Sequence, residues 1–231
     1  MPETMDQQVR TAAARRLPIV LSVVAGMVDL TGFLTLGHIF TAHVTGNLAF
    51  LAADLVRGEA PRVAQALIVP LYMLAMTASF LIARRARLRD ASPLSVLLWI
   101  QLLLLACVFV FSCITVPSAR PEGVAADVAA AIAVCAMGCQ YALVRMLLPG
   151  TPSTASMTIN LTDTVLLLLD TAASNRSQTA NARDRSMQAA GVLTGFLAGC
   201  VIAALAVSFL EDGAWSLPVG LAALALAIHR H

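Results

Sequence analysis

One carboxylate, Asp29, stands in the middle of a long apolar stretch near the start of the 231-residue chain, flanked by Gly26 and Gly32. A charged side chain at the centre of a bilayer costs at least about 2.5–3.5 kcal/mol on insertion scales, so it needs a partner, a proton or water. We therefore expect Asp29 either to bind a proton, a cation or a solute, or to make a buried hydrogen bond between helices.

Small and polar residues interrupt the apolar sequence soon after Asp29, at Gly37 and His38, before it restarts with the run HVTGN at 43–47. In lipid, interrupted backbone must find hydrogen-bond partners or line a wet cavity. Thr45 is expected to cap the next helix, with its first amides free for an anion or carbonyl or satisfied without a ligand. His43 titrates near neutral pH and suits proton coupling. The candidate binding residues here are Thr41, His43, Thr45, Gly46 and Asn47.

A weaker copy of this pattern returns in the second half of the chain. Displaced by 113 positions, six of the twelve residues 37–48 are identical to their counterparts. This density of Gly, Thr and Asn predicts an internal duplication within one membrane domain, 1–231, with repeats 17–117 and 124–229. Broken segments at corresponding places in two halves indicate a binding site inside a membrane. The pairs are Gly37–Gly150, Thr41–Thr154, Ala42–Ala155, Thr45–Thr158, Asn47–Asn160 and Leu48–Leu161, with Gly26–Gly138 one gap earlier.

Further polar residues of the second half join this candidate site. Gln140 and Arg145 lie in one apolar segment. Arg145 is expected either to reach the membrane interface with its long side chain or to pair with Asp29 or Asp163 across the bundle. Asp163 follows Asn160 by three residues and is expected to face the cavity. The second-half candidates are Gln140, Arg145, Thr154, Thr158, Asn160 and Asp163.

No pattern in the sequence indicates a metal or a cofactor. His38 and His43 are five residues apart and do not share a helix face. The five cysteines lie in apolar runs, where cysteine acts as a small buried hydrophobe. Walker-type phosphate loops, GxSxG and HExxH are all missing from the sequence. We expect no metal site, no cofactor and none of the common hydrolase chemistries.

The composition is that of a membrane protein. The chain is 59% hydrophobic and 12% charged, whereas soluble domains carry about 25% charged residues. All 15 basic residues are arginines, nearly all of them outside the apolar segments and without interleaved aromatic residues, which argues against nucleic acid as a partner. The lipid bilayer and a small solute or proton are the expected partners.

Eight apolar segments predict an all-α, polytopic membrane protein. We expect the first segment to stay in the mature protein as a membrane helix, although Arg15 and Arg16 before it mimic a signal peptide. Pro70 predicts a kink in the third segment. The segments are 17–37, 44–56, 63–83, 93–117, 124–148, 155–170, 187–210 and 214–229.

The arginine distribution predicts the topology. With the N-terminus in the cytoplasm, five arginines face outside if all eight segments cross, but three if 44–56 and 155–170 are re-entrant. The positive-inside rule and the shortness of 44–56 favour the second arrangement. It has six spanning helices and two short broken or re-entrant elements in two inverted repeats, and eight spanning helices remain the alternative. The five are Arg84, Arg85, Arg87, Arg89 and Arg145; the three are Arg57, Arg62 and Arg120.

Three glycines, Gly191, Gly195 and Gly199, recur at every fourth position in the seventh segment. Such a series exposes bare backbone to which another helix can pack closely. We expect this face either to pack against a helix of the same chain or to form a homodimer.

Several motifs of the chain match a known pattern. They are AGxVD at 25–29, Gly32-Phe33, HVTGN at 43–47, Gly138-x-Gln140, Arg145 and the Thr, Asn and Leu residues of 154–161. In these the chain, over roughly 17–210, resembles the YoaK-like family of uncharacterised bacterial inner-membrane proteins. The resemblance implies a multi-span protein, sometimes labelled as a transporter of small metabolites. The chain departs at Tyr141, where the family commonly has Asn, and at Ile159, where it has Gly.

These features favour a membrane transporter or channel for a small solute, with its site at the interface of the two repeats. Asp29 would supply charge or a proton site. One alternative is an intramembrane enzyme acting on a lipid through Asp29, His43 and Asp54. The other is a non-catalytic membrane partner subunit that docks through the glycine face.

Overall fold

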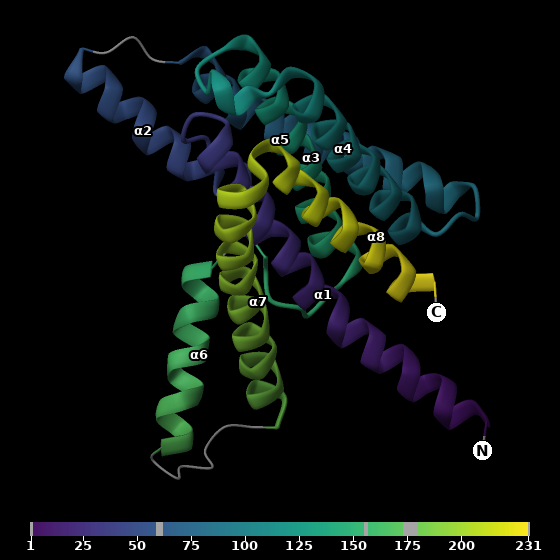
Figure 1. The fold of residues 1–231 in the computed structure, drawn as a ribbon. Helices are drawn as coiled ribbons and strands as arrows, with labels where there is room; N and C mark the ends of the chain where they lie inside the picture. Colours follow the sequence, from purple (N-terminus) through teal and green to yellow (C-terminus); the bar gives the residue numbers. More distant parts are fainter. Residues whose placement is uncertain (1, 59–61, 155–156, 173–179, 231) are drawn as a thin grey trace.

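The fold is entirely helical in the residues that the computed structural model describes, 2–58, 62–154, 157–172 and 180–230. The all-α class predicted from the sequence is confirmed, and Figure 1 gives the arrangement. The elements are α1 (Pro2–Thr35), α2 (Val44–Arg57), α3 (Val63–Leu88), α4 (Pro93–Thr115), the 3-10 turn η1 (Pro117–Ala119), α5 (Val124–Leu147), α6 (Met157–Ala172), α7 (Ala180–Leu210), the 3-10 turn η2 (Glu211–Trp215) and α8 (Ser216–Arg230).

Five stretches within these residues are long and apolar enough to cross a membrane. The last stretch runs from α7 through η2 to the end of α8, which has only 15 residues of its own. The other short helices, α2 with 14 residues and α6 with 16, lie outside these stretches and at 1.5 Å per residue are about 21 and 24 Å long, short of the roughly 30 Å hydrocarbon core. The stretches are Arg16–Thr35, Ala64–Leu88, Pro93–Thr115, Val124–Leu147 and Arg183–Arg230.

The first helix begins earlier than the sequence analysis expects. The apolar segment starts at residue 17, but α1 starts at Pro2 and continues through Pro18. The polar residues before the span are mainly Glu, Gln, Ala and Arg, which are good helix formers and extend the helix beyond its apolar part.

Large apolar side chains cover the outside of the bundle. Leu74 on α3, Ile114 on α4 and Phe209 on α7 are 66%, 75% and 82% exposed. Exposed apolar surface on this scale is typical of helices that face lipid. The helix surfaces therefore agree with the membrane assignment made from composition.

Two helices, α1 and α5, organise the packing. α1 packs against α7 and α8, and α5 packs in the same way against α3 and α4. The closest approaches are at glycines, because a Cβ at Gly26 would overlap the Phe196 carbonyl on α7. A Cβ at Gly138 would likewise press on Ala75 of α3. Without a hydrophobic drive between helices in lipid, such close backbone packing supplies the stabilising contacts.

The glycine series of α7 faces α1 of the same chain. Side-chain atoms of Ile19 lie against Gly191 and Gly195, and a Cβ at Gly199 would overlap the Val23 carbonyl. The face therefore makes the intramolecular helix contact that was one of its two expected uses.

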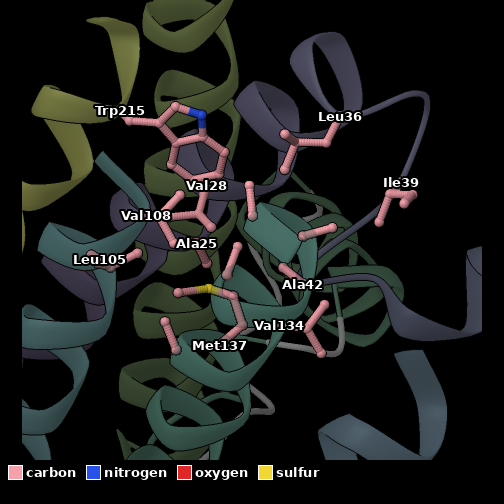
Figure 2. Packing of buried hydrophobic residues seen from close by; sticks show 14 of the residues in the cluster. Ala25, Val28, Leu36, Ile39, Ala42, Leu105, Val108, Val134, Met137 and Trp215 are labelled. Atoms are coloured by element: carbon pink, nitrogen blue, oxygen red, sulfur yellow. The ribbon is translucent and has the colours of Figure 1, made fainter. Parts of the chain in front are cut away.

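A core of buried apolar side chains lies between α1, α4, α5 and the turn before α8. Figure 2 shows the Trp215 ring above Val28, with Val108, Met137 and Val134 below it. Trp215 is fully buried in this core. This core joins residues of α1, α4, α5 and η2.

The loop before α2 and the start of α3 lie at the same end of the bundle. Arg62, just before α3, donates through Nη1 to the Gly37 carbonyl at 2.9 Å. Its Nη2 donates to the Pro121 carbonyl at 2.9 Å and to Asp127 of α5 at 2.6 Å. The end of α1, the start of α3 and the start of α5 thus lie together. The chain therefore leaves α1 and enters α3 at the same end of the bundle.

Candidate functional site

The carboxylate of Asp29 is buried, 3% exposed, and holds the loop that leads into α2. Its Oδ1 accepts backbone N–H groups from Thr41 at 2.8 Å and Ala42 at 2.7 Å, with a longer contact of 3.4 Å from His43. The backbone amides of the loop have no helical partner, and Asp29 accepts hydrogen bonds from them. These bonds offset the cost of burying the carboxylate.

His43 completes the environment of this carboxylate. Its Nδ1 donates to Asp29 Oδ2 at 2.6 Å, and its side chain is 33% exposed. The ring lies edge-on to Phe196 of α7 at 5.2 Å between centroids. The hydrogen bond that the imidazole donates to Asp29 raises the pKa of His43, and burial offsets part of the rise. The pair is thus a proton-binding group with one sealed side and one accessible side.

The start of α2 differs from the predicted cap. The helix begins at Val44 with His43 as its N-cap, and no side chain caps it. Thr45 is exposed within the first turn, so the expectation that it caps the helix is wrong. The distant acid Asp29 binds the preceding amides instead. Gly46 packs against the ring of Phe40, at a distance that leaves little room for a side chain.

The two asparagines of the predicted repeat make the same contact in their own halves. Asn47 Nδ2 donates to the carbonyl of Phe40 at 2.6 Å, and Asn160 Nδ2 donates to that of Ser153 at 2.8 Å, in both cases seven residues back. Both asparagines are buried. Each asparagine therefore ties the start of its short helix to the loop before it. We call the loop before α2, 36–43, the first break, and the described part of the loop before α6, 148–154, the second break.

Two further features recur at both breaks. Gly37 and Gly150 have positive φ, 71° and 80°, which a side chain would strain. The hydroxyls of Thr41 and Thr154 are both buried without a hydrogen-bond partner. The breaks thus share their turn geometry as well as their sequence.

The second break has its own small cavity of about 80 Å³. It is lined by Tyr141, Val144 and Arg145 of α5 and by the turn that follows this helix. Arg145 is exposed and does not pair with Asp29, whose oxygens are held by the loop and His43. The structure therefore has two neighbouring polar sites where the sequence analysis expects one.

Gln140 of α5 is hydrogen-bonded to both α1 and α4. Its Nε2 donates to the Leu21 carbonyl of α1 at 2.9 Å, and its Oε1 accepts from Gln101 of α4 at 2.6 Å. Both glutamines are fully buried. On α6, Thr158 is exposed and Asp163 is partly exposed. These three candidates lie apart from the Asp29–His43 pair.

Two comparisons identify what the chain is related to. The family model described as "Protein of unknown function (DUF1275)" matches residues 17–228. The chain belongs to this family. Over 43 residues it is 54% identical to the UPF0700 transmembrane protein YoaK of Bacillus subtilis (strain 168), which covers 18% of this chain and 19% of that protein. The match thus spans about a fifth of the relative. No solved structure matches the chain.

The YoaK-like resemblance inferred from the motifs is therefore confirmed, and this DUF1275 chain is a transmembrane protein with several apolar helices. Among the residues described here, no group of three His, Cys, Asp or Glu residues is placed to hold a metal ion.

Sequence reasoning missed two contributors to the sites of this DUF1275 protein. Tyr141 donates its hydroxyl to the Ala42 carbonyl at 3.1 Å and so reaches from α5 into the first break. Its departure from the family pattern was the available signal. Arg62 reads as an ordinary loop arginine, and nothing local in the sequence indicates that it reaches Gly37.

Proposed function

We propose that this protein is a proton-coupled transporter of a small solute in the bacterial inner membrane. The observation that carries the proposal is the Asp29–His43 pair, held at 2.6 Å in an apolar helix bundle. Two backbone amides close to 2.8 Å fix the carboxylate, so His43 is the member free to gain or lose a proton. Buried ionisable residues in membrane helices are expensive and mark ion or proton pathways.

The two members of the pair belong to different elements, so a change in their contact can move one element relative to the other. Asp29 lies on α1, whereas His43 and the two amides belong to the loop that begins α2. When His43 loses its proton, the ion pair becomes a hydrogen bond from a neutral imidazole to the Asp29 carboxylate, which is weaker because only the acceptor is charged. The attachment of α2 to α1 then loosens, and proton occupancy is coupled to the position of α2.

An inverted repeat is part of the proposal. The matching asparagine contacts, the glycine turns, and the corresponding packing of α1 on α7 and α5 on α3 support a duplication of 17–117 into 124–229. With α2 and α6 re-entrant, each half crosses three times, and an odd number of crossings inverts the second copy. The arginine distribution favours a cytoplasmic N-terminus.

The test is proton movement in proteoliposomes. The purified protein is reconstituted into phosphatidylethanolamine–phosphatidylglycerol vesicles that contain a pH-sensitive dye. Inward gradients of acetate, glycine, glycerol and glucose are then imposed one at a time, with empty vesicles as the background. We expect one gradient to acidify the lumen faster than the background, and Asp29→Asn to abolish this excess. Thr158→Val, on an exposed position of α6, is the matched control.

Two results would overturn the proposal. One is a wild-type signal equal to that of empty vesicles for every solute. The other is an Asp29→Asn variant whose rate and pH profile equal those of Thr158→Val.

A further inference from the structure

The second break lacks the acid that serves the first. Gly26 corresponds to Gly138, so the position of Asp29, three residues later, corresponds to Tyr141. Tyr141 turns its hydroxyl away to the Ala42 carbonyl in the first break. The second half therefore places no carboxylate where the first half has one.

The cavity at the second break opens beside the turn that follows α5. Leu148, Thr151 and Ser153 of this turn line it, and Gly150 has open space where a side chain would stand. The buried Thr154 hydroxyl lies outside the lining and is without a partner just as that of Thr41 is at the first break, so it carries no weight for a ligand.

The cavity has the size and charge for a small anion. Arg145 is the one charged residue in its lining, and Val144 and Leu148 form an apolar wall. A cavity of about 80 Å³ exceeds the roughly 10–15 Å³ that one water needs several-fold, so it has room for a small molecule of a few heavy atoms. The carbonyl end of α5 opposes an anion here, and the guanidinium in its last turn offsets that field.

We propose that this cavity binds the carboxylate of a short monocarboxylate such as acetate. The carboxylate of the ligand supplies beside Arg145 the negative charge that the Tyr141 side chain does not carry. Arg145 binds it through paired N–H groups, a geometry that guanidinium and carboxylate share. The methyl group lies against Val144 and Leu148.

Tyr141 connects this site to the proton site. Its ring lines the cavity, its hydroxyl donates to the Ala42 carbonyl, and the Ala42 amide donates to Asp29. A ligand that shifts the ring therefore acts on the loop that Asp29 holds. The inference names a substrate class for the proposed transporter and rests on that proposal for its role, although binding itself needs no transport.

The test is acetate binding to the full-length protein in lipid nanodiscs, measured by saturation-transfer NMR on the acetate methyl group. We expect saturable binding to the wild type and much weaker binding of acetamide, its neutral isostere. Arg145→Gln should weaken acetate binding at least about tenfold, because it removes a charge-assisted contact. Arg145→Lys keeps the charge but loses the paired N–H groups, so its affinity should fall between those of the wild type and Arg145→Gln. Arg89→Gln, at an exposed loop arginine, is the matched control.

Equal binding of acetate and acetamide overturns the inference, as does unchanged affinity in Arg145→Gln or no acetate binding at all. If Arg145→Gln does not fold, the comparison of acetate with acetamide on the wild type decides. Loss of transport with acetate binding intact refutes the proposed function alone. Proton-coupled flux of another solute, with no acetate binding, refutes this inference alone.

Discussion

Replacing Asp29 separates its structural role from its charge. Asp29→Ala removes the acceptor of two well-formed amide bonds, from Thr41 at 2.8 Å and Ala42 at 2.7 Å. Each buried donor left without a partner costs about 1–3 kcal/mol, so we expect the free energy of unfolding to fall by about 2–6 kcal/mol. Asp29→Asn keeps an oxygen for both amides and loses only the charge toward His43, which we expect to cost about 1–2 kcal/mol.

The assay is unfolding of the purified protein in mixed micelles by increasing SDS, followed by tryptophan fluorescence. Thr158→Ala, at an exposed position, gives the background of an ordinary alanine substitution. The reasoning predicts that Asp29→Ala is the least stable variant and that Asp29→Asn lies between it and the control. Equal stability of Asp29→Ala and Asp29→Asn would refute the claim that the carboxylate holds the loop.

Three further predictions use the same unfolding assay. Folding raises the pKa of His43 above 6.5, so the stability that its charged form contributes is complete below pH 6.5 and is lost as the pH rises through the pKa of the folded protein. His43→Gln should remove this pH dependence of the free energy of unfolding, and an unchanged pH profile in the variant would contradict the reasoning. Gly199→Ala should cost about 1–3 kcal/mol because its Cβ overlaps the backbone of α1, whereas Gly220→Ala meets nothing and should cost little; equal losses would contradict the packing. Arg62→Gln and Asp127→Asn should show a coupling of about 1 kcal/mol in a double-mutant cycle, since both groups are partly exposed, and additive effects would contradict the ion pair.

Helix positions were predictable because the apolar runs follow bilayer thickness. The predicted segment 44–56 matches α2, Val44–Arg57, since the break before it is marked by Gly37 and His38, both with positive φ. Polar sequence beyond a membrane span carries no such signal, which is why the start of α1 was misplaced. Local composition gave the spans but not the helical extension.

Two signals in the sequence pointed to residues of the site: the pattern that recurs in the second half, and an acid within an apolar run. Asn47 and Asn160 stand out through the sequence match between the two halves, and their contacts are short-range, seven residues back in each half. The cap of α2 was mispredicted because its acceptor, Asp29, lies more than ten residues earlier on another helix. Tyr141 and Arg62 act through contacts that only the folded chain creates.

The two topologies place the end of α2 on different sides of the membrane, and this difference can be measured. His38 follows the end of α1, and Arg57 ends α2; both are exposed. Because Arg62 reaches the Gly37 carbonyl, we expect His38 and Arg57 on one side of the membrane and Arg87 on the other. A variant without the five native cysteines should carry His38→Cys, Arg57→Cys or Arg87→Cys, each labelled with an impermeant maleimide in oriented vesicles.

With a re-entrant α2 and a cytoplasmic N-terminus, reagent added outside labels positions 38 and 57 and leaves 87 unlabelled. If all eight segments crossed, position 57 would instead lie inside and 87 outside. Labelling of 87 together with 38, and not 57, would therefore overturn the re-entrant path. It would also remove the inverted repeat, because four crossings in each half return the chain to its starting side and give both copies the same orientation.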